Sequence, residues 1–237
     1  MKNLCPKTEL ALHPIAYIRT DFPDKFGIPR QSGLVDTLTA RLVFVPECRK
    51  EDCFRGITEF SHLWLLWGFS ENKKRDWTPT VRPPRLGGNT RKGVFATRSP
   101  YRPNPVGLSC VRLEKYIPSS PDGPVLFVSG ADMMDNTPIF DIKPYLPFTD
   151  SHPEACGGFS TRGLSHRLSV HISEDLLQKI PQEKRQPLTD CLSLDPRPSY
   201  QNDPARIYGM EFAGMDIHFK VEGNRLFVTD ICPISRS

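Results

Sequence analysis

One short segment of the sequence combines a stiff backbone with positive charge. Arg98-Ser-Pro-Tyr-Arg-Pro-Asn-Pro-Val-Gly-Leu-Ser109 holds two arginines among three prolines. Each proline fixes its own φ and steers the preceding residue away from helical backbone, which predicts an extended, preordered loop. Such a loop can present Arg98 and Arg102 to an anion with little loss of conformational entropy. A rigid connector between strands and a proline-rich ligand for an aromatic groove remain as alternatives.

The segment 73–92 carries seven basic residues against one acid. Because it has no apolar periodicity, it is too polar for a core, and it can grip the phosphates of a nucleic acid while Trp77 stacks on a base. The alternative is a solvated surface loop. The candidate phosphate contacts in this segment are Lys73, Lys74, Arg75, Arg82, Arg85, Arg91 and Lys92.

Three carboxylates, Asp132, Asp135 and Asp141, follow a predicted strand. They can form a metal site, hold a cationic ligand or supply a general base. Lys143 and the lack of a histidine among them argue against a dedicated metal cage, so we predict no metal site. His62 lies in an aromatic strand and would by itself be structural more often than catalytic. The Gly-rich nucleotide fingerprints and the usual hydrolase motifs are absent from the sequence.

The elements that must position these residues are predicted to be mostly strands between His13 and Pro153. Nothing there has the length and apolar period of a crossover helix, so an alternating βαβ sheet is disfavoured. An antiparallel barrel removes unpaired strand edges. We therefore predict a mainly β protein whose first domain, residues 13–155, is a β-barrel. The predicted strands are Leu38–Val45, His62–Phe69, Gly93–Thr97, Val106–Ile117 and Val125–Ala131.

The remainder of the chain predicts a small α+β domain at residues 165–237. Ser173 precedes an acidic first turn, which is typical of an N-capped short helix, and Pro181 ends or bends that helix. A second short helix is expected at Gln182–Cys191. Met215–Val221 and Leu226–Ile231 alternate and are joined by a Gly-Asn turn, which predicts a β-hairpin.

Composition limits the class of protein. The 24 prolines among 237 residues are about twice the usual share and favour strands and loops over long helices. The formal charge of +4 points only weakly to a polyanionic partner. The seven cysteines form no C-x-x-C pair and are predicted to be reduced thiols. The longest apolar run, Leu63 to Trp67, is far too short to span a bilayer, so we predict a soluble, cytoplasmic protein with no membrane segment.

Five separated motifs together resemble one family. Beside Arg98–Ser109, they are Pro29-Arg-Gln-Ser-Gly33, Phe60-Ser-His-Leu-Trp64, Asp132-Met-Met-Asp-Asn-Thr-Pro138 and Asp141-Ile-Lys-Pro-Tyr145. With Asp195-Pro-Arg-Pro-Ser-Tyr200 near the C-terminus, they make the chain similar to the TsaA-like family in its full-length bacterial form. The resemblance covers most of the chain.

This resemblance implies a fold, a reaction and a set of contacts. Members of the family are homodimers with a β-barrel in place of a Rossmann sheet. They transfer a methyl group from S-adenosyl-L-methionine to N6 of threonylcarbamoyl-adenosine beside the anticodon of threonine tRNA. The tRNA contacts are then the basic residues of segment 73–92 together with Arg102. The implied cofactor contacts are Pro29, Arg30, Gln31, Ser61, His62, Arg98, Leu108, Asp132, Met133, Met134, Asp135, Asn136 and Thr137.

The implied substrate suggests a need for a base. Its N6 nitrogen belongs to a urea-like group with a delocalised lone pair, so removal of the N6 proton should assist where positioning alone is not enough. The hypothetical base is Asp135, Asp141 or His62. Arg98 or Arg102 can bind the threonyl carboxylate or a phosphate through its planar fork. The alternatives are a non-catalytic S-adenosylmethionine- or RNA-binding regulatory module and a metal-dependent hydrolase that uses the three carboxylates.

Overall fold

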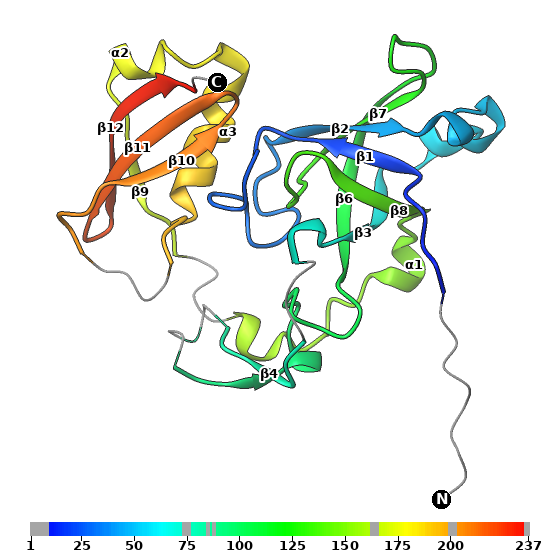
Figure 1. Cartoon of the computed structure of the whole chain (residues 1–237), viewed down its shortest axis with the longest axis horizontal. Coiled ribbons are helices and arrows are strands. Elements are labelled where there is room, and N and C mark those ends of the chain that lie inside the picture. The colour runs from blue at the N-terminus through cyan, green and yellow to red at the C-terminus, as the bar shows by residue number, and fades with distance from the viewer. Residues whose placement is uncertain are drawn as a thin grey trace, which may run out of the picture.

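In a computed structural model, the chain forms a closed β-barrel and a second, smaller sheet with its own helices (Figure 1). The structure describes residues 10–72, 77–83, 86, 89–161, 166–198 and 203–234. The barrel contains the strands near the N-terminus and in the middle of the chain. The smaller sheet contains the last strands, drawn in orange and red (Figure 1).

Six strands close the barrel in the spatial order β1-β2-β7-β6-β3-β8. Every neighbouring pair is antiparallel, so the closed barrel leaves no free edge. The predicted mainly β fold with an antiparallel barrel is confirmed. The bounds are β1 (Ala16–Arg19), β2 (Thr39–Phe44), β3 (His62–Gly68), β6 (Val106–Ile117), β7 (Val125–Ser129) and β8 (Thr137–Pro144).

The barrel interior follows the two-residue period of its strands. On β3, Leu63, Leu65 and Trp67 are buried, while the residues between them are half-buried on the outer face. Each of the six strands contributes at least one side chain to this core. The strand residues nearest the loops that follow β3 and β7 are therefore held by a packed interior.

A four-stranded sheet of order β10-β11-β12-β9 forms the second unit. The expected hairpin is present as β11 and β12, and β9 lies parallel to β12. In the described part of the chain, no helix has the length and apolar character of a membrane span; α3, at 12 residues, is the longest there. The bounds are β9 (Ser169–His171), α2 (Glu174–Leu177), α3 (Gln182–Ser193), β10 (Tyr208–Phe212), β11 (Met215–Glu222) and β12 (Arg225–Pro233).

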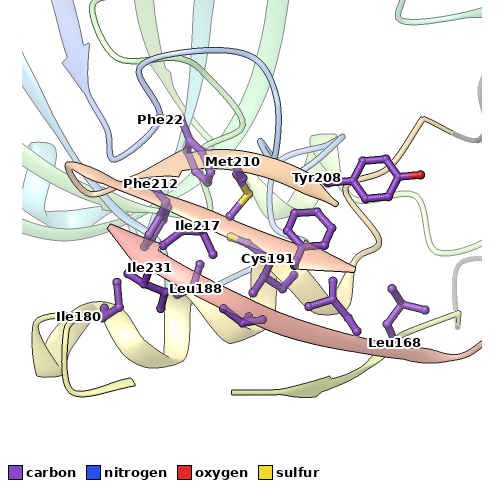
Figure 2. Close-up of a cluster of buried hydrophobic side chains, with 14 of the residues drawn as sticks. Phe22, Leu168, Ile180, Leu188, Cys191, Tyr208, Met210, Phe212, Ile217 and Ile231 are labelled. Atoms are coloured by element: carbon purple, nitrogen blue, oxygen red, sulfur yellow. The ribbon is translucent and has the colours of Figure 1, made fainter. Parts of the chain in front are cut away.

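The core of this second sheet includes side chains from the connection between β1 and β2. Phe22, Val35 and Leu38 are 2, 4 and 4% exposed and belong to the same cluster as the residues of α3 and β10–β12. Figure 2 shows Phe22 pointing toward β10, the strand that carries Met210 and Phe212. The rings of Phe22 and Phe212 meet edge to face at 5.3 Å. Residues 20–38 therefore belong to the apolar core of the C-terminal sheet, which is separate from the core inside the barrel.

Several local predictions differ from the structure. The predicted strand Gly93–Thr97 is wrong: β5 (Lys92–Gly93) pairs only with β4 (Thr80–Val81), and a 3-10 turn follows. Ser173 is the N-cap of α2, but its side chain makes no capping hydrogen bond. The other short helices are η1 (Pro46–Cys48), η2 (Glu51–Phe54), η3 (Ile57–Glu59), η4 (Ser70–Asn72), η6 (Val94–Ala96), α1 (Pro147–Asp150) and η7 (Gly158–Thr161).

Candidate functional site

A hollow of about 1580 Å³ lies where β3 ends and where the loop between β7 and β8 begins. Five stretches of the chain contribute to its lining: 25–34, 67–71, 78–101, 132–137 and 157–160. Two of the motifs that resemble the family, at Pro29 and at Asp132, therefore meet with the proline-rich loop in one place. Its volume exceeds the range of about 300–1,000 Å³ that is usual for one small ligand. It thus has room for a cofactor and part of a second substrate.

Asp132 lies in the wall of this hollow, where side chains from β3 and β6 hold it. The Ser109 hydroxyl donates a hydrogen bond to Asp132 Oδ1 at 2.5 Å. The Trp67 indole N–H in turn donates to Ser109 Oγ at 2.9 Å. Gly107 makes room for this arrangement, because a side-chain carbon there would overlap the Trp67 ring. We call the side chains of Trp67, Ser109 and Asp132 the carboxylate relay.

Burial raises the pKa of Asp132 above its usual value. Hydrogen bonds from the Ser109 hydroxyl and from the backbone at Ser32 and Asp132, together with the positive charge of Arg98, oppose this shift without cancelling it. Asp132 is therefore a carboxyl group that takes up a proton more readily than an exposed aspartate. Perturbed carboxyls of this kind are common at functional sites.

Gln31 and Arg98 join the first motif to the proline-rich loop at the hollow. Arg98 Nη1 donates to Gln31 Oε1 at 2.6 Å, and both residues line the hollow together with Pro29. Arg30 also lines it, and its Nη2 donates to the backbone oxygen of Arg197 at 3.1 Å. The predicted cofactor residues of the first motif are thus brought next to Asp132.

The loop from Asp132 to Thr137 is held by threonine hydroxyls that donate to its backbone oxygens. Thr20 Oγ1 donates to the Met133 oxygen at 3.2 Å, and Thr137 Oγ1 donates to the Met134 oxygen at 2.9 Å. Asn136 has a positive φ of 62°, a conformation that asparagine tolerates better than most residues. Met133, Met134 and Thr137 line the hollow.

The other two candidate carboxylates turn elsewhere. Asp135 is 3.5 Å from Arg19 and accepts a hydrogen bond from the Thr20 N–H at 3.0 Å. Asp141 pairs with Lys143 at 2.9 Å and accepts from the N–H of Ile142. Because the three carboxylates point apart, they do not form the cluster that the hydrolase alternative requires. Across the described residues, no group of three acids, histidines or cysteines is arranged for a metal ion.

His62 and Leu108 also lie away from the hollow. His62 begins β3, six residues before Gly68, so it is about 20 Å along the strand from the end that reaches the hollow. Its ring faces Tyr145, and Ser61 Oγ lies 2.9 Å from His62 Nδ1. Leu108 is on the outer face of β6 and is 53% exposed. These three predicted cofactor residues, Ser61, His62 and Leu108, are not brought to Asp132 within one chain.

The basic segment contributes to the hollow in part. Arg82 and Arg91 line it, and Lys92 lies over the ring of Phe159 with its Nζ 5.9 Å from the ring centre. Arg102 donates to the Thr97 backbone oxygen within its own loop. The predicted tRNA contacts Lys73, Lys74, Arg75 and Arg85 lie outside the described residues.

Aromatic side chains near the hollow were not predicted from the sequence. Phe95 lines it and is 78% exposed, and Phe159 and Tyr101 also contribute to the lining. Trp77, which was predicted to stack on a base, is 50% exposed. Exposed aromatic rings beside arginines are typical of surfaces that bind unstacked bases.

Comparison with known proteins supplies a family. A model of the tRNA-methyltransferase O N-terminal domain matches residues 17–151, and a model of the TrmO C-terminal domain matches residues 165–234. A tRNA (adenine(37)-N6)-methyltransferase of Escherichia coli is 38% identical over 215 residues, which is 87% of this chain and 91% of that protein.

Two further relatives come from Pseudomonas aeruginosa. A putative S-adenosylmethionine-dependent methyltransferase is 38% identical over 217 residues, covering 88% of this chain and 91% of that protein. The crystal structure of TrmO from this organism superimposes with a TM-score of 0.76 at 31% identity, covering 95% of this chain and 100% of that chain.

Proposed function

We propose a particular substrate for this chain, which belongs to the tRNA-methyltransferase O family. As a member of that family it is an S-adenosylmethionine-dependent tRNA (adenine-N6)-methyltransferase. The substrate is N6 of threonylcarbamoyl-adenosine next to the anticodon of threonine tRNA, which the enzyme meets in the cytoplasm. The observation that carries this proposal is the meeting of Gln31, Arg98 and Asp132 at one hollow. That hollow has room for two ligands and combines positive charge with a buried carboxylate.

The lining of the hollow suits S-adenosylmethionine. The cofactor has a carboxylate, which the Arg98 guanidinium can pair with, and polar edges for the Gln31 amide. Met134 and Thr137 supply further contacts beside it. When bound, the cofactor supplies an activated methyl group on a positively charged sulfur. We propose that Pro29, Gln31, Arg98, Met134 and Thr137 hold it in this hollow.

The side of the hollow formed by residues 77–101 suits the tRNA. Arg82 and Arg91 are positively charged, and Phe95 exposes most of its ring. We propose that the arginines contact phosphates and that Phe95 stacks on an unstacked base of the anticodon loop. The threonyl carboxylate of the modified base would add one more negative group for an arginine to bind.

A methyl-transfer assay tests the proposed substrate directly. The purified protein is incubated with labelled S-adenosylmethionine and with threonine tRNA that either carries or lacks the threonylcarbamoyl group. We expect label in the modified tRNA, and mass analysis of the nucleosides to place it on N6. Equal transfer to both tRNAs would overturn the substrate proposal. Cofactor binding with transfer to neither tRNA would favour the regulatory binding module.

We further propose that the enzyme is a homodimer. On the outer face of the barrel, Leu66 pairs with Leu108 and Trp64 pairs with Cys110, so four apolar side chains adjoin on the side away from the core. A patch of this kind suits an interface between copies of one chain. A dimer would also allow Ser61 and His62 to approach a site on the other copy. Sedimentation of a Leu108→Glu variant tests this: we expect a monomer, and an unchanged dimer would contradict the proposal.

We also propose that the C-terminal domain, residues 165–237, assists tRNA binding by shaping the cofactor site. Lys184 on α3 pairs with the Asp21 carboxylate at 2.6 Å, and the Ala213 N–H donates to the backbone oxygen of Asp21. The Thr37 hydroxyl donates to Asp190 at 2.6 Å. These contacts hold the two ends of the connection that carries Gln31. Loss of this support should disorder the first motif before it affects the barrel.

A further inference from the structure

The carboxylates that line the hollow differ in how they are held. Among the described residues these are Glu71 and Asp132. Glu71 is exposed in a short 3-10 turn, whereas Asp132 is the end of the carboxylate relay. A group that receives a proton in a reaction must be aimed before the substrate arrives, because misplacement lowers the rate steeply. Asp132 is the carboxylate that meets this condition.

The carboxylate relay also determines which group donates each of its hydrogen bonds. The Trp67 indole N–H can only donate, so Ser109 Oγ accepts from it and directs its own proton to Asp132. The backbone at Ser32 and at Asp132 also favours the charged form of this carboxyl. An ionised carboxylate has about four acceptor positions, so beyond the Ser109 hydrogen bond Asp132 keeps positions for a proton from a bound substrate.

The electrostatic surroundings make Asp132 a stronger base than an exposed aspartate. Burial weakens the acidity of Asp132, and the charged group that faces it across the hollow, Arg98, moderates this effect. A carboxylate in water is too weak a base to assist an amide-like nitrogen, and a raised pKa brings base strength closer to the working range. Asp135 and Asp141, by contrast, are paired with Arg19 and Lys143.

We propose that Asp132 is the general base of the methyl transfer and that Ser109 and Trp67 are its positioning residues. This rests on the proposed function, since it concerns the same hollow and the same substrate. The N6 nitrogen forms a bond to the methyl carbon while the carbon–sulfur bond breaks and leaves its electron pair on sulfur. Asp132 accepts the N6 proton. The products are the N6-methylated nucleoside, S-adenosylhomocysteine and a protonated carboxyl that later releases its proton to water.

The first test replaces the base with its uncharged isostere. Asp132→Asn keeps an acceptor for Ser109, so we expect its single-turnover rate on modified tRNA to fall by about 100-fold or more, since general bases contribute about 10²–10⁴. Glu71→Gln should keep the wild-type rate. Calorimetry should show that Asp132→Asn binds S-adenosylhomocysteine and tRNA as the wild type does. A variant that keeps its rate, or one that loses affinity for S-adenosylhomocysteine, would overturn the assignment.

The second test follows pH. The wild-type rate should fall as pH falls through the pKa of Asp132, and this fall should be absent from Asp132→Asn. The Ser109 hydroxyl stabilises the charged form, so Ser109→Ala should shift the fall to higher pH; Trp67→Phe should shift it the same way by less. A merely structural role for Ser109 would lower the rate equally at every pH, which would contradict the relay.

The activity of the wild-type enzyme in the same series distinguishes failure of the proposed function from failure of the role assigned to Asp132. If it transfers no methyl group to modified tRNA, the proposed function fails and the inference fails with it. If it is active and Asp132→Asn is equally active, only the inference fails. Urea unfolding of each variant identifies any loss of rate that follows from loss of the fold.

Discussion

Two loops face the hollow, and they are held in opposite ways. Residues 20–38 carry Phe22, Val35 and Leu38 into the core of the C-terminal sheet, so burial fixes their path. Figure 2 shows Phe22 in this position. The described part of residues 77–102 buries Val94 but exposes Trp77 and Phe95, and prolines and short-range hydrogen bonds shape it. Residues 20–38 therefore depend on a distant core for their conformation, whereas residues 77–102 can change their exposed side chains with little effect on the stability of the fold.

A matched pair of phenylalanine truncations should give the largest difference between the loops. Phe22→Ala removes a ring that is 2% exposed and should lower the free energy of unfolding by about 3–5 kcal/mol. Phe95→Ala removes a ring that is 78% exposed and should change it by less than about 0.5 kcal/mol while weakening tRNA binding. Urea unfolding and filter binding measure the two effects. Equal losses of stability in Phe22→Ala and Phe95→Ala would contradict the claim that the two loops are held in opposite ways.

A pair of lysine substitutions sharpens the role of the C-terminal domain. Lys184 pairs with Asp21 across the two units in a mostly buried contact, so Lys184→Ala should cost about 1.5–3 kcal/mol and weaken cofactor binding. Lys179 pairs with Asp230 within the C-terminal domain, and both are nearly half exposed. Lys179→Ala should cost at most about 1 kcal/mol and leave cofactor affinity unchanged. If Lys184→Ala and Lys179→Ala weaken cofactor binding equally, residues 20–38 do not connect the C-terminal domain to the cofactor site.

Two aspartates should show opposite pH dependence of stability. The pKa of Asp132 is raised, so the folded protein loses stability relative to Asp132→Asn as pH rises above the usual value of 3.8 and through the raised pKa. The pKa of Asp150 is lowered, first by the Leu146 N–H and then by the Trp64 indole. Asp150→Asn should therefore be less stable than the wild type at neutral pH, with the difference vanishing as pH falls through the lowered pKa. Urea midpoints from about pH 4 to about pH 7 follow the Asp132 series, and a lower range follows the Asp150 series. If the stability difference between wild type and variant changed with pH in the same direction for Asp132 and Asp150, the environments assigned to these two carboxyls would be contradicted.

The smallest effects are expected from single arginines of the exposed loop. Arg82→Ala and Arg91→Ala should each lower the slope of log affinity for tRNA against log salt by about one, with little change in stability. Arg41 on β2 lies in the barrel wall and pairs weakly with Asp122 at 4.0 Å, so Arg41→Ala is a suitable control. An unchanged slope for both loop variants would remove this loop from the tRNA interface.

The strands that the sequence predicted well are those with a clear two-residue period. β6 has the predicted bounds, and the β11–β12 hairpin has its predicted turn. β8 was missed because Pro138 and Pro144 lie at its ends, Asp132 and Asp135 precede it, and Asp141 lies within it. Gly93–Thr97 was predicted to be a strand from its apolar residues, yet only Val94 is buried, and its neighbours contact the hollow instead. The local residue pattern therefore gave a wrong strand prediction where the loop is shaped by contacts with distant parts of the chain.

The candidate site was predictable as a set of motifs but not as a geometry. Spacing brings Asp132, Asp135 and Asp141 close along the chain, and only the fold reveals that they turn to different partners. The carboxylate relay joins β3, β6 and the loop before β8, so no sequence spacing indicates it. The sharing of a core between residues 20–38 and the C-terminal sheet is likewise a long-range contact.

The central claim is that residues 20–38, the proline-rich loop and Asp132 form one site for the cofactor. A crystal structure with S-adenosylhomocysteine tests it most directly. We predict that the ligand lies in the hollow, in contact with Gln31 and Arg98 and with its sulfur on the side of Asp132. Ligand density at another part of the barrel, with the hollow filled only by water, would contradict the account.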